Sequence, residues 1–131
     1  MSFDENVFIN CPFDPPYRVL LNPLLFTIIY FRLEPKIAET ESSGHIRVQQ
    51  IINLIKESKY SIHDISRNEA GEMPRFNLPY EMGLDVGCQT FGNREMQTKC
   101  CIILDKDKYR YREVVSDIGG QDIKDHNNEP L

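Results

Sequence analysis

Two acidic residues stand where a carboxylate adds nothing to a hydrophobic core. Asp64 lies near the end of the apolar run 60–65, and Glu81 lies in the first turn of a helical pattern that starts near residue 78. A strand that ends and a helix that starts at one edge of a sheet would bring both acids together. Burial raises the pKa of such a carboxylate and a helix N-terminus lowers it, so the sequence leaves the sign open. We predict an active site there, with Glu81 as the candidate catalytic residue.

The residues around Asp64 permit both a functional and a structural interpretation. Asp64 can accept hydrogen bonds from a sugar or hold a loop, and His63 points to the opposite face of the strand, where a hydrogen-bonded core histidine is the commoner case. Ser66 could contact a ligand and Arg67 could bind a phosphate, although both also fit a charged turn. A nucleophilic triad and the glycine-rich phosphate loops are not indicated by any motif in the sequence.

The helical pattern after residue 78 has two faces, and either could pack on the sheet. Glu81, Asp85 and Gln89 form one stripe, while Gly83 and Gly87 lie on the other side. In one interpretation the glycines allow close packing and the carboxylates face water. In the other, Glu81 lies in apolar surroundings at the site.

Strand-like and helix-like segments alternate along most of the chain, which predicts an α/β fold with a mostly parallel central sheet. Expected strands cover residues 7–10, 33–38, 60–65 and 99–104, and expected helices cover a stretch from residue 17, a stretch ending near 57, 78–91 and a weaker one at 109–116. The run 99–104 has the continuous apolar character of a strand covered on both faces. Residues 117–131 show no period, and we expect no final strand or helix there.

Two residues near the expected helix starts have more than one interpretation. Pro23 either kinks the first helix or begins its regular part behind an Asn22 cap. Arg47 lies in a first helical turn, where the helix dipole disfavours a cation, so we expect an acidic partner or an anionic ligand beside it.

Composition limits the class of protein. The chain has 131 residues, 40% of them hydrophobic, which predicts one domain over 1–131. Its net charge of -5 argues against extended nucleic acid as a partner. The longest apolar stretch, residues 19–31, is interrupted and too short to span a membrane, and the acidic start is unlike a secretory signal. We therefore expect a cytoplasmic protein. Its four cysteines lack the spacing of a zinc site, so we expect packed thiols and no metal.

The segment from Asn77 to Gly83, Asn-Leu-Pro-Tyr-Glu-Met-Gly, follows a strand that ends in Asp64-Ile-Ser. This arrangement resembles the pattern of TIR-like proteins and of the related nucleoside 2-deoxyribosyltransferase-like proteins, and residues 7–14 are similar to their first strand and loop. The resemblance implies a flavodoxin-like three-layer sandwich that cleaves or transfers the N-glycosidic bond of NAD or a nucleoside, with no cofactor. It implies a catalytic Glu81, with Asp64 and Asn77 contacting the ribose. Bacterial relatives are often defence effectors that act when assembled, so a homo-oligomer is expected.

Together, the sheet edge and the resemblance give a set of candidate substrate-binding residues: Asn10, Pro12, Phe13, Asp14, Asp64, Ser66, Arg67 and Asn77. A different class remains open, a non-catalytic module of the same fold that binds a nucleotide or assembles with partners. A phosphoacceptor domain is a weaker alternative, because Asn10 and Cys11 stand where its acidic pair would be.

Overall fold

A single sheet of five parallel strands organises the chain, in the order β2-β1-β3-β4-β5. The computed structural model describes residues 2–38, 44–66, 77–109, 112 and 115–130. The strands are β1 (Asn6–Asn10), β2 (Glu34–Lys36), β3 (Tyr60–Asp64), β4 (Cys100–Asp105) and β5 (Asp122–Asp125). This strand order is that of flavodoxin-like folds, so the predicted fold class is confirmed.

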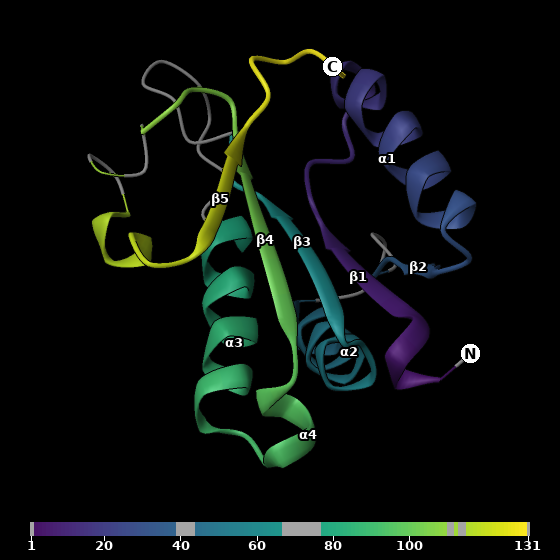
Figure 1. The fold of residues 1–131 in the computed structure, drawn as a ribbon, viewed down its shortest axis with the longest axis vertical. Coiled ribbons are helices and arrows are strands. Elements are labelled where there is room, and N and C mark those ends of the chain that lie inside the picture. The colour runs from purple at the N-terminus through teal and green to yellow at the C-terminus, as the bar shows by residue number, and fades with distance from the viewer. Residues whose placement is uncertain (1, 39–43, 67–76, 110–111, 113–114, 131) are drawn as a thin grey trace.

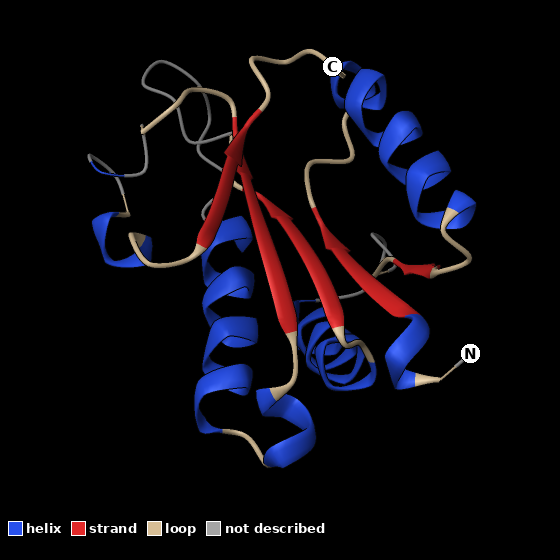
Figure 2. Cartoon of the chain, viewed as in Figure 1, coloured by secondary structure: helices blue, strands red, loops and turns tan. Residues whose placement is uncertain are grey.

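Helices cover both faces of the sheet, which gives three layers (Figures 1 and 2). The α-helices are α1 (Arg18–Tyr30), α2 (Gly44–Glu57), α3 (Asn77–Phe91) and the short α4 (Arg94–Gln97), and 3-10 turns lie at Phe3–Glu5, Pro15–Tyr17 and Ser116–Ile118. Helix α1 packs on one face against Val7 and Ile9 of β1. Helices α2 and α3 pack on the other face, where Phe8 and Ile103 are buried.

The loop between β1 and α1 is fixed by a local cap. Asp14 precedes the 3-10 turn, and its Oδ1 accepts a hydrogen bond from the backbone N–H of Tyr17 at 3.1 Å. Helix α1 follows directly and already begins at Arg18. Pro23 therefore lies inside the helix, not at its start, and the Thr27 hydroxyl donates to the Pro23 carbonyl at 2.8 Å.

Strand β4 differs from its prediction in one respect. Its side chains alternate between exposed and buried, with Ile103 fully buried and Ile102 38% exposed. The strand is thus covered by α3 on one face and open on the face that α1 shares, and the expectation of cover on both faces is wrong. An apolar run of this kind does not reveal how many layers the sheet has.

The C-terminal stretch also differs from its prediction. Residues 122–125 add a fifth strand beside β4, although the sequence showed no period there. After β5 the chain crosses the carboxyl edge of the sheet and ends near the start of α1 (Figure 1). Half of the weaker helix expected at 109–116 lies outside the described residues. No helix in the described ranges is both long and apolar enough to cross a membrane.

Candidate active site

The carboxyl ends of the parallel strands meet at one edge, as the sequence predicts. Asn10 ends β1, Asp64 ends β3 and Asp105 ends β4, and all three side chains are buried. Helix α3 begins at this edge, since the Asn10 amide donates to the carbonyl of Leu78 at 3.0 Å. The edge therefore brings the Asp64 strand end and the start of the Glu81 helix into one region.

Asp64 is fully buried and accepts three hydrogen bonds. Its Oδ2 accepts from the Tyr17 hydroxyl at 2.6 Å and lies 2.9 Å from Nε2 of His126, and its Oδ1 accepts from the Ser66 backbone N–H at 2.9 Å. Burial alone would raise the pKa of Asp64, but the bonds from His126, Ser66 and Tyr17 outweigh it and hold the pKa below its ordinary value. The carboxylate is thus an anion that joins three segments of the chain.

Glu81 has different electrostatic surroundings. It is 3% exposed, and one oxygen, Oε1, lies 3.7 Å from Nη2 of Arg47 in the first turn of α2. Burial raises the pKa of Glu81, and the Arg47 guanidinium opposes this without cancelling it. The acidic partner expected for Arg47 is therefore Glu81. A carboxylate of this kind can accept a proton or act as a nucleophile more readily than a solvated one.

The orientation of α3 decides between the two faces that the sequence offered. Glu81 and Asp85 face the protein interior, with Asp85 fully buried. Gly83 is exposed, and a methyl group added at Gly83 or Gly87 would meet nothing within 4 Å. The interpretation in which the glycines pack on the sheet and the acids face water is wrong.

The predicted binding residues of the first loop lie at the same edge. Asn10 is buried and uses its amide for His63 and Leu78, and Pro12 is buried as well. Phe13 is half-buried and packs against the core on the α1 side. Asp14 is half-buried and caps the turn at Tyr17.

The predicted binding residues of the second loop are only partly described. Ser66 is 3% exposed, and its hydroxyl has no hydrogen-bond partner within the part of the chain that the structure describes. Asn77 is exposed at the first position of α3. Arg67 lies outside the described residues. A buried hydroxyl without a partner is costly, so Ser66 is well suited to a ligand.

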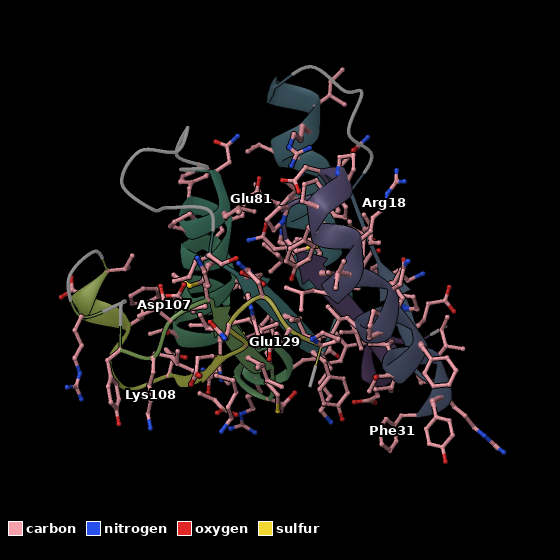
Figure 3. All side chains as sticks on the ribbon, turned by 90° about the horizontal axis from the view of Figure 1, so that it is seen from above. Arg18, Phe31, Glu81, Asp107, Lys108 and Glu129 are labelled. Carbon is pink, nitrogen blue, oxygen red and sulfur yellow. The ribbon has the colours of Figure 1, made fainter. Side chains whose placement is uncertain are left out.

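Two residues of the site were not found from the sequence, Tyr17 and His126. Each forms a hydrogen bond with Asp64, from which Tyr17 is 47 and His126 is 62 positions away in the sequence. No sequence motif connects residues that are so far apart. Both also line a cavity of about 200 Å³ between α1, β4 and the C-terminal segment, together with Leu20, Leu24, Leu104 and Glu129. The described lining does not include Glu81. Figure 3 shows this region from above, with Glu81 and Glu129 labelled.

A group of three possible metal ligands lies beneath the edge: His63, Asp85 and Cys101, whose ligand atoms lie within 4.8 Å of one another. The Lys99 ammonium already lies 3.2 Å from Asp85 Oδ1, where it would repel a metal cation. Burial, with the neighbouring Asp85, raises the pKa of the Cys101 thiol to about 12, so the thiolate form that binds metals is disfavoured. These residues fit a buried polar network better than a metal site.

Solved structures with a similar fold come from several organisms. A CMP N-glycosidase of Clostridium botulinum has a TM-score of 0.63 at 13% identity, with 93% of this chain and 89% of that chain covered. A 2-deoxyribosyltransferase of Leishmania mexicana has a TM-score of 0.58 at 19% identity, covering 83% of this chain and 69% of that one. A diflavin flavoprotein A3 of Nostoc sp. has a TM-score of 0.54 at 10% identity, covering 95% and 75%.

The chain shares its fold with these proteins. No protein-family model matches the sequence, and no curated protein matches it either. In open sheets of this order, ligands bind at the carboxyl edge where the strand order reverses, which is between β1 and β3. Asn10 and Asp64 end these two strands, so the shared fold and the buried acids indicate the same region.

Proposed function

We propose that the protein cleaves or transfers the N-glycosidic bond of a nucleoside, a nucleotide or NAD, with Glu81 as the catalytic carboxylate. The observation that carries this proposal is a buried Glu81 at the carboxyl edge of the sheet whose pKa is raised by burial. Two proteins of the same fold are named for this type of chemistry, an N-glycosidase and a 2-deoxyribosyltransferase. The motif from Asn77 to Gly83 supports the same assignment.

The chemistry requires a carboxylate beside the sugar. As the bond between C1′ and the base nitrogen breaks, positive charge builds on the ribose, and the Glu81 carboxylate stabilises it electrostatically or bonds to C1′. The base leaves with the electron pair: the base of a nucleoside or nucleotide takes up a proton as it leaves, whereas nicotinamide leaves NAD already neutral and takes up none. Water, or a second base, then attacks C1′, gives up a proton and releases the carboxylate. This reaction is hydrolysis with water and transfer with a base.

Asp64 has a supporting part in this proposal. All of its described hydrogen bonds hold protein segments, namely Tyr17, the Ser66 backbone and His126. It holds the backbone of Ser66, whose hydroxyl has no partner in the described ranges. We propose that Ser66 and Asn77 contact the ribose, and that Asp64 holds the surrounding segments in place.

The test is release of the base. The protein is incubated with NAD and with a panel of nucleosides and nucleotides, and small products are identified by mass spectrometry. We expect Glu81→Gln to lower turnover by at least about 100-fold while the far-ultraviolet circular dichroism stays unchanged. Glu95→Gln is the matched control, because it makes the same change at an exposed position of α4 and leaves turnover intact.

Two other outcomes would change the assignment. Undiminished turnover in Glu81→Gln would contradict the catalytic role. Calorimetric binding of a nucleotide with no product would place the protein in the class of non-catalytic modules.

The open apolar surface supports a homo-oligomer. Ile102 is exposed on the face of β4 that α1 leaves uncovered, and Val19 and Phe26 are exposed on α1 itself. We assign this surface to contact between copies of the chain. A cytoplasmic location and a role in bacterial defence stay predictions, and phage challenge of cells with and without the protein tests the second.

A further inference from the structure

A chain of polar side chains is buried beneath the proposed active site. His63, Asp85 and Lys99 are each at most 2% exposed. His63 Nε2 lies 2.7 Å from Asp85 Oδ2, and Lys99 Nζ lies 3.2 Å from Asp85 Oδ1. Such a network is weak evidence for a role in stability, because removing charged groups from water costs free energy that their mutual attraction can fail to offset.

The two ends of the network bond to backbone carbonyls of two helices. At one end, Lys99 donates to the carbonyl of Ile55 at 2.8 Å and to that of Ser58, where α2 ends. At the other end, the Asn10 amide lies 3.1 Å from His63 Nδ1 and donates to the Leu78 carbonyl at 3.0 Å. With both amide hydrogens used in this way, His63 accepts at Nδ1 and carries its proton on Nε2, from which it donates to Asp85.

This network contacts α3 on both sides of Glu81. Leu78, Glu81 and Asp85 recur at three and four positions, so they lie on one face of the helix. Asn10 holds the helix at Leu78, and His63 holds it at Asp85. Glu81 itself has its described ion pair with Arg47, a side chain that is 26% exposed. The position of the Glu81 carboxylate is thus set by where the helix is held.

We propose that Asn10 and His63 are positioning residues that hold the first two turns of α3 against β1 and β3, and so fix Glu81 for catalysis. This inference rests on the proposed function, and it assigns Asn10 to the helix instead of to the substrate. An error of about 1 Å in placing a catalytic group can cost about 100-fold in rate, so two hydrogen bonds at the helix start can have a large effect.

The test compares Asn10→Ala with Asn6→Ala. Asn6 lies on the same strand, is 4% exposed, and donates its amide to the Glu57 carbonyl at 2.8 Å, so its loss removes a similar bond that is made to α2 and not to α3. We expect Asn10→Ala to lower kcat by about 10- to 100-fold with KM within about twofold of the wild type. Asn6→Ala keeps kcat within about twofold, although it destabilises the protein to a similar extent. Should Asn10→Ala fail to fold, His63→Gln is measured in its place.

A second measurement does not need turnover. The backbone amides of Glu81 and Met82 donate to first-turn carbonyls of α3, so their hydrogen exchange reports on that turn. We expect Asn10→Ala to speed their exchange at least about tenfold relative to residues 86–88 of the same helix. Asn6→Ala leaves this ratio unchanged.

Each outcome decides the inference. Equal kcat losses in the two variants, or an unchanged exchange ratio in Asn10→Ala, would overturn it. A raised KM with normal kcat would also overturn it, because Asn10 would then contact the substrate. If the wild type releases no base, the proposed function fails, and the exchange ratio still shows whether Asn10 holds the helix.

Discussion

At neutral pH, the buried negative charge of Glu81 destabilises the folded state. Its folded pKa is raised above 4.5 by burial, so the folded state holds its proton more tightly than the unfolded chain does. For an acid of this kind, stability is lost as the pH rises from the unfolded pKa through the folded one. A buried anion that destabilises the fold is typical of residues kept for function.

We therefore predict that Glu81→Gln stabilises the protein while it removes activity. The neutral amide has the same shape and avoids burying a charge, so the melting temperature at pH 7 should rise by a few degrees. The gain should disappear below pH 4.5, where the wild-type carboxyl is already protonated. Calorimetry at both pH values checks this. A lower melting temperature at pH 7, or an equal gain at pH 4, would contradict the prediction.

Arg47 keeps the pKa of Glu81 lower than burial alone would set it. Removing the guanidinium in Arg47→Met should raise this pKa further, so the acid limb of the kcat/KM profile should move to higher pH. Arg47→Lys, which keeps a positive charge, should move it less. The measurement is base release across the pH range. An acid limb that does not move in Arg47→Met would show that Arg47 does not act on Glu81.

The sequence located the two acids but not all of their partners. Glu81 and Asp64 could be selected because an acid at the end of an apolar run, or in a largely apolar helix turn, needs an explanation. Tyr17 and His126 could not, because each meets Asp64 only after the chain has folded. The buried charge of Asp85 was also unpredictable, since it depends on His63 of β3 and on Lys99 just before β4.

At the scale of elements, Asp64 joins segments that the sheet alone does not connect. It holds the turn before α1 through Tyr17, the segment after β3 through Ser66, and the segment after β5 through His126. Its pKa is lowered below 3.8 because these bonds outweigh the effect of burial. Its stabilisation is therefore present above pH 3.8 and is lost as the pH falls through the folded pKa.

We expect Asp64→Asn to lower the free energy of unfolding at pH 7 by at least about 2 kcal/mol, since an amide cannot accept all three bonds and leaves donors unpaired. The difference from the wild type should shrink as the pH falls below 3.8. Urea denaturation at pH 7 and pH 3 measures both. Asp122→Asn is the control, because Asp122 pairs with Lys124 at the surface and should change stability by less than about 0.5 kcal/mol. A loss that is the same at both pH values would contradict the role of charge.

The elements themselves were predictable where the pattern is strong. Strands β1, β3 and β4 and helices α2 and α3 follow apolar runs or helical spacing, and local chemistry decides them. Strand β5 has the sequence Asp-Ile-Lys-Asp and forms because β4 offers a free edge, which is a tertiary effect. The face that α3 buries also depends on tertiary partners, because paired acids can replace apolar residues on a buried face.

At the scale of the molecule, one side of the sheet is less covered than the other. Helix α1 packs over β1 and β3, while Ile102 of β4 stays 38% exposed on the same side. The outer surface of α1 is apolar too, with Phe26 70% exposed and stacked on Tyr30. Phe31, at the end of the helix, projects outward at the edge of the molecule (Figure 3). Exposed apolar side chains of this kind are typical of protein–protein contact.

We predict that the wild type is a homo-oligomer held together by this surface, and that Ile102→Lys dissociates it. A lysine in the middle of the open face of β4 would place a charge in the interface, where desolvation penalises it. Phe91→Lys is the matched control, because Phe91 is 89% exposed at the end of α3, in the layer on the other side of the sheet, and its replacement should leave the assembly intact.

Sedimentation velocity over a range of concentrations measures the assembly of all three proteins. A wild type that stays monomeric at every concentration, or an Ile102→Lys variant that assembles as the wild type does, would contradict the prediction. Because Ile102 and Glu81 lie on opposite sides of the sheet, turnover of the dissociated variant also shows whether assembly is needed for catalysis.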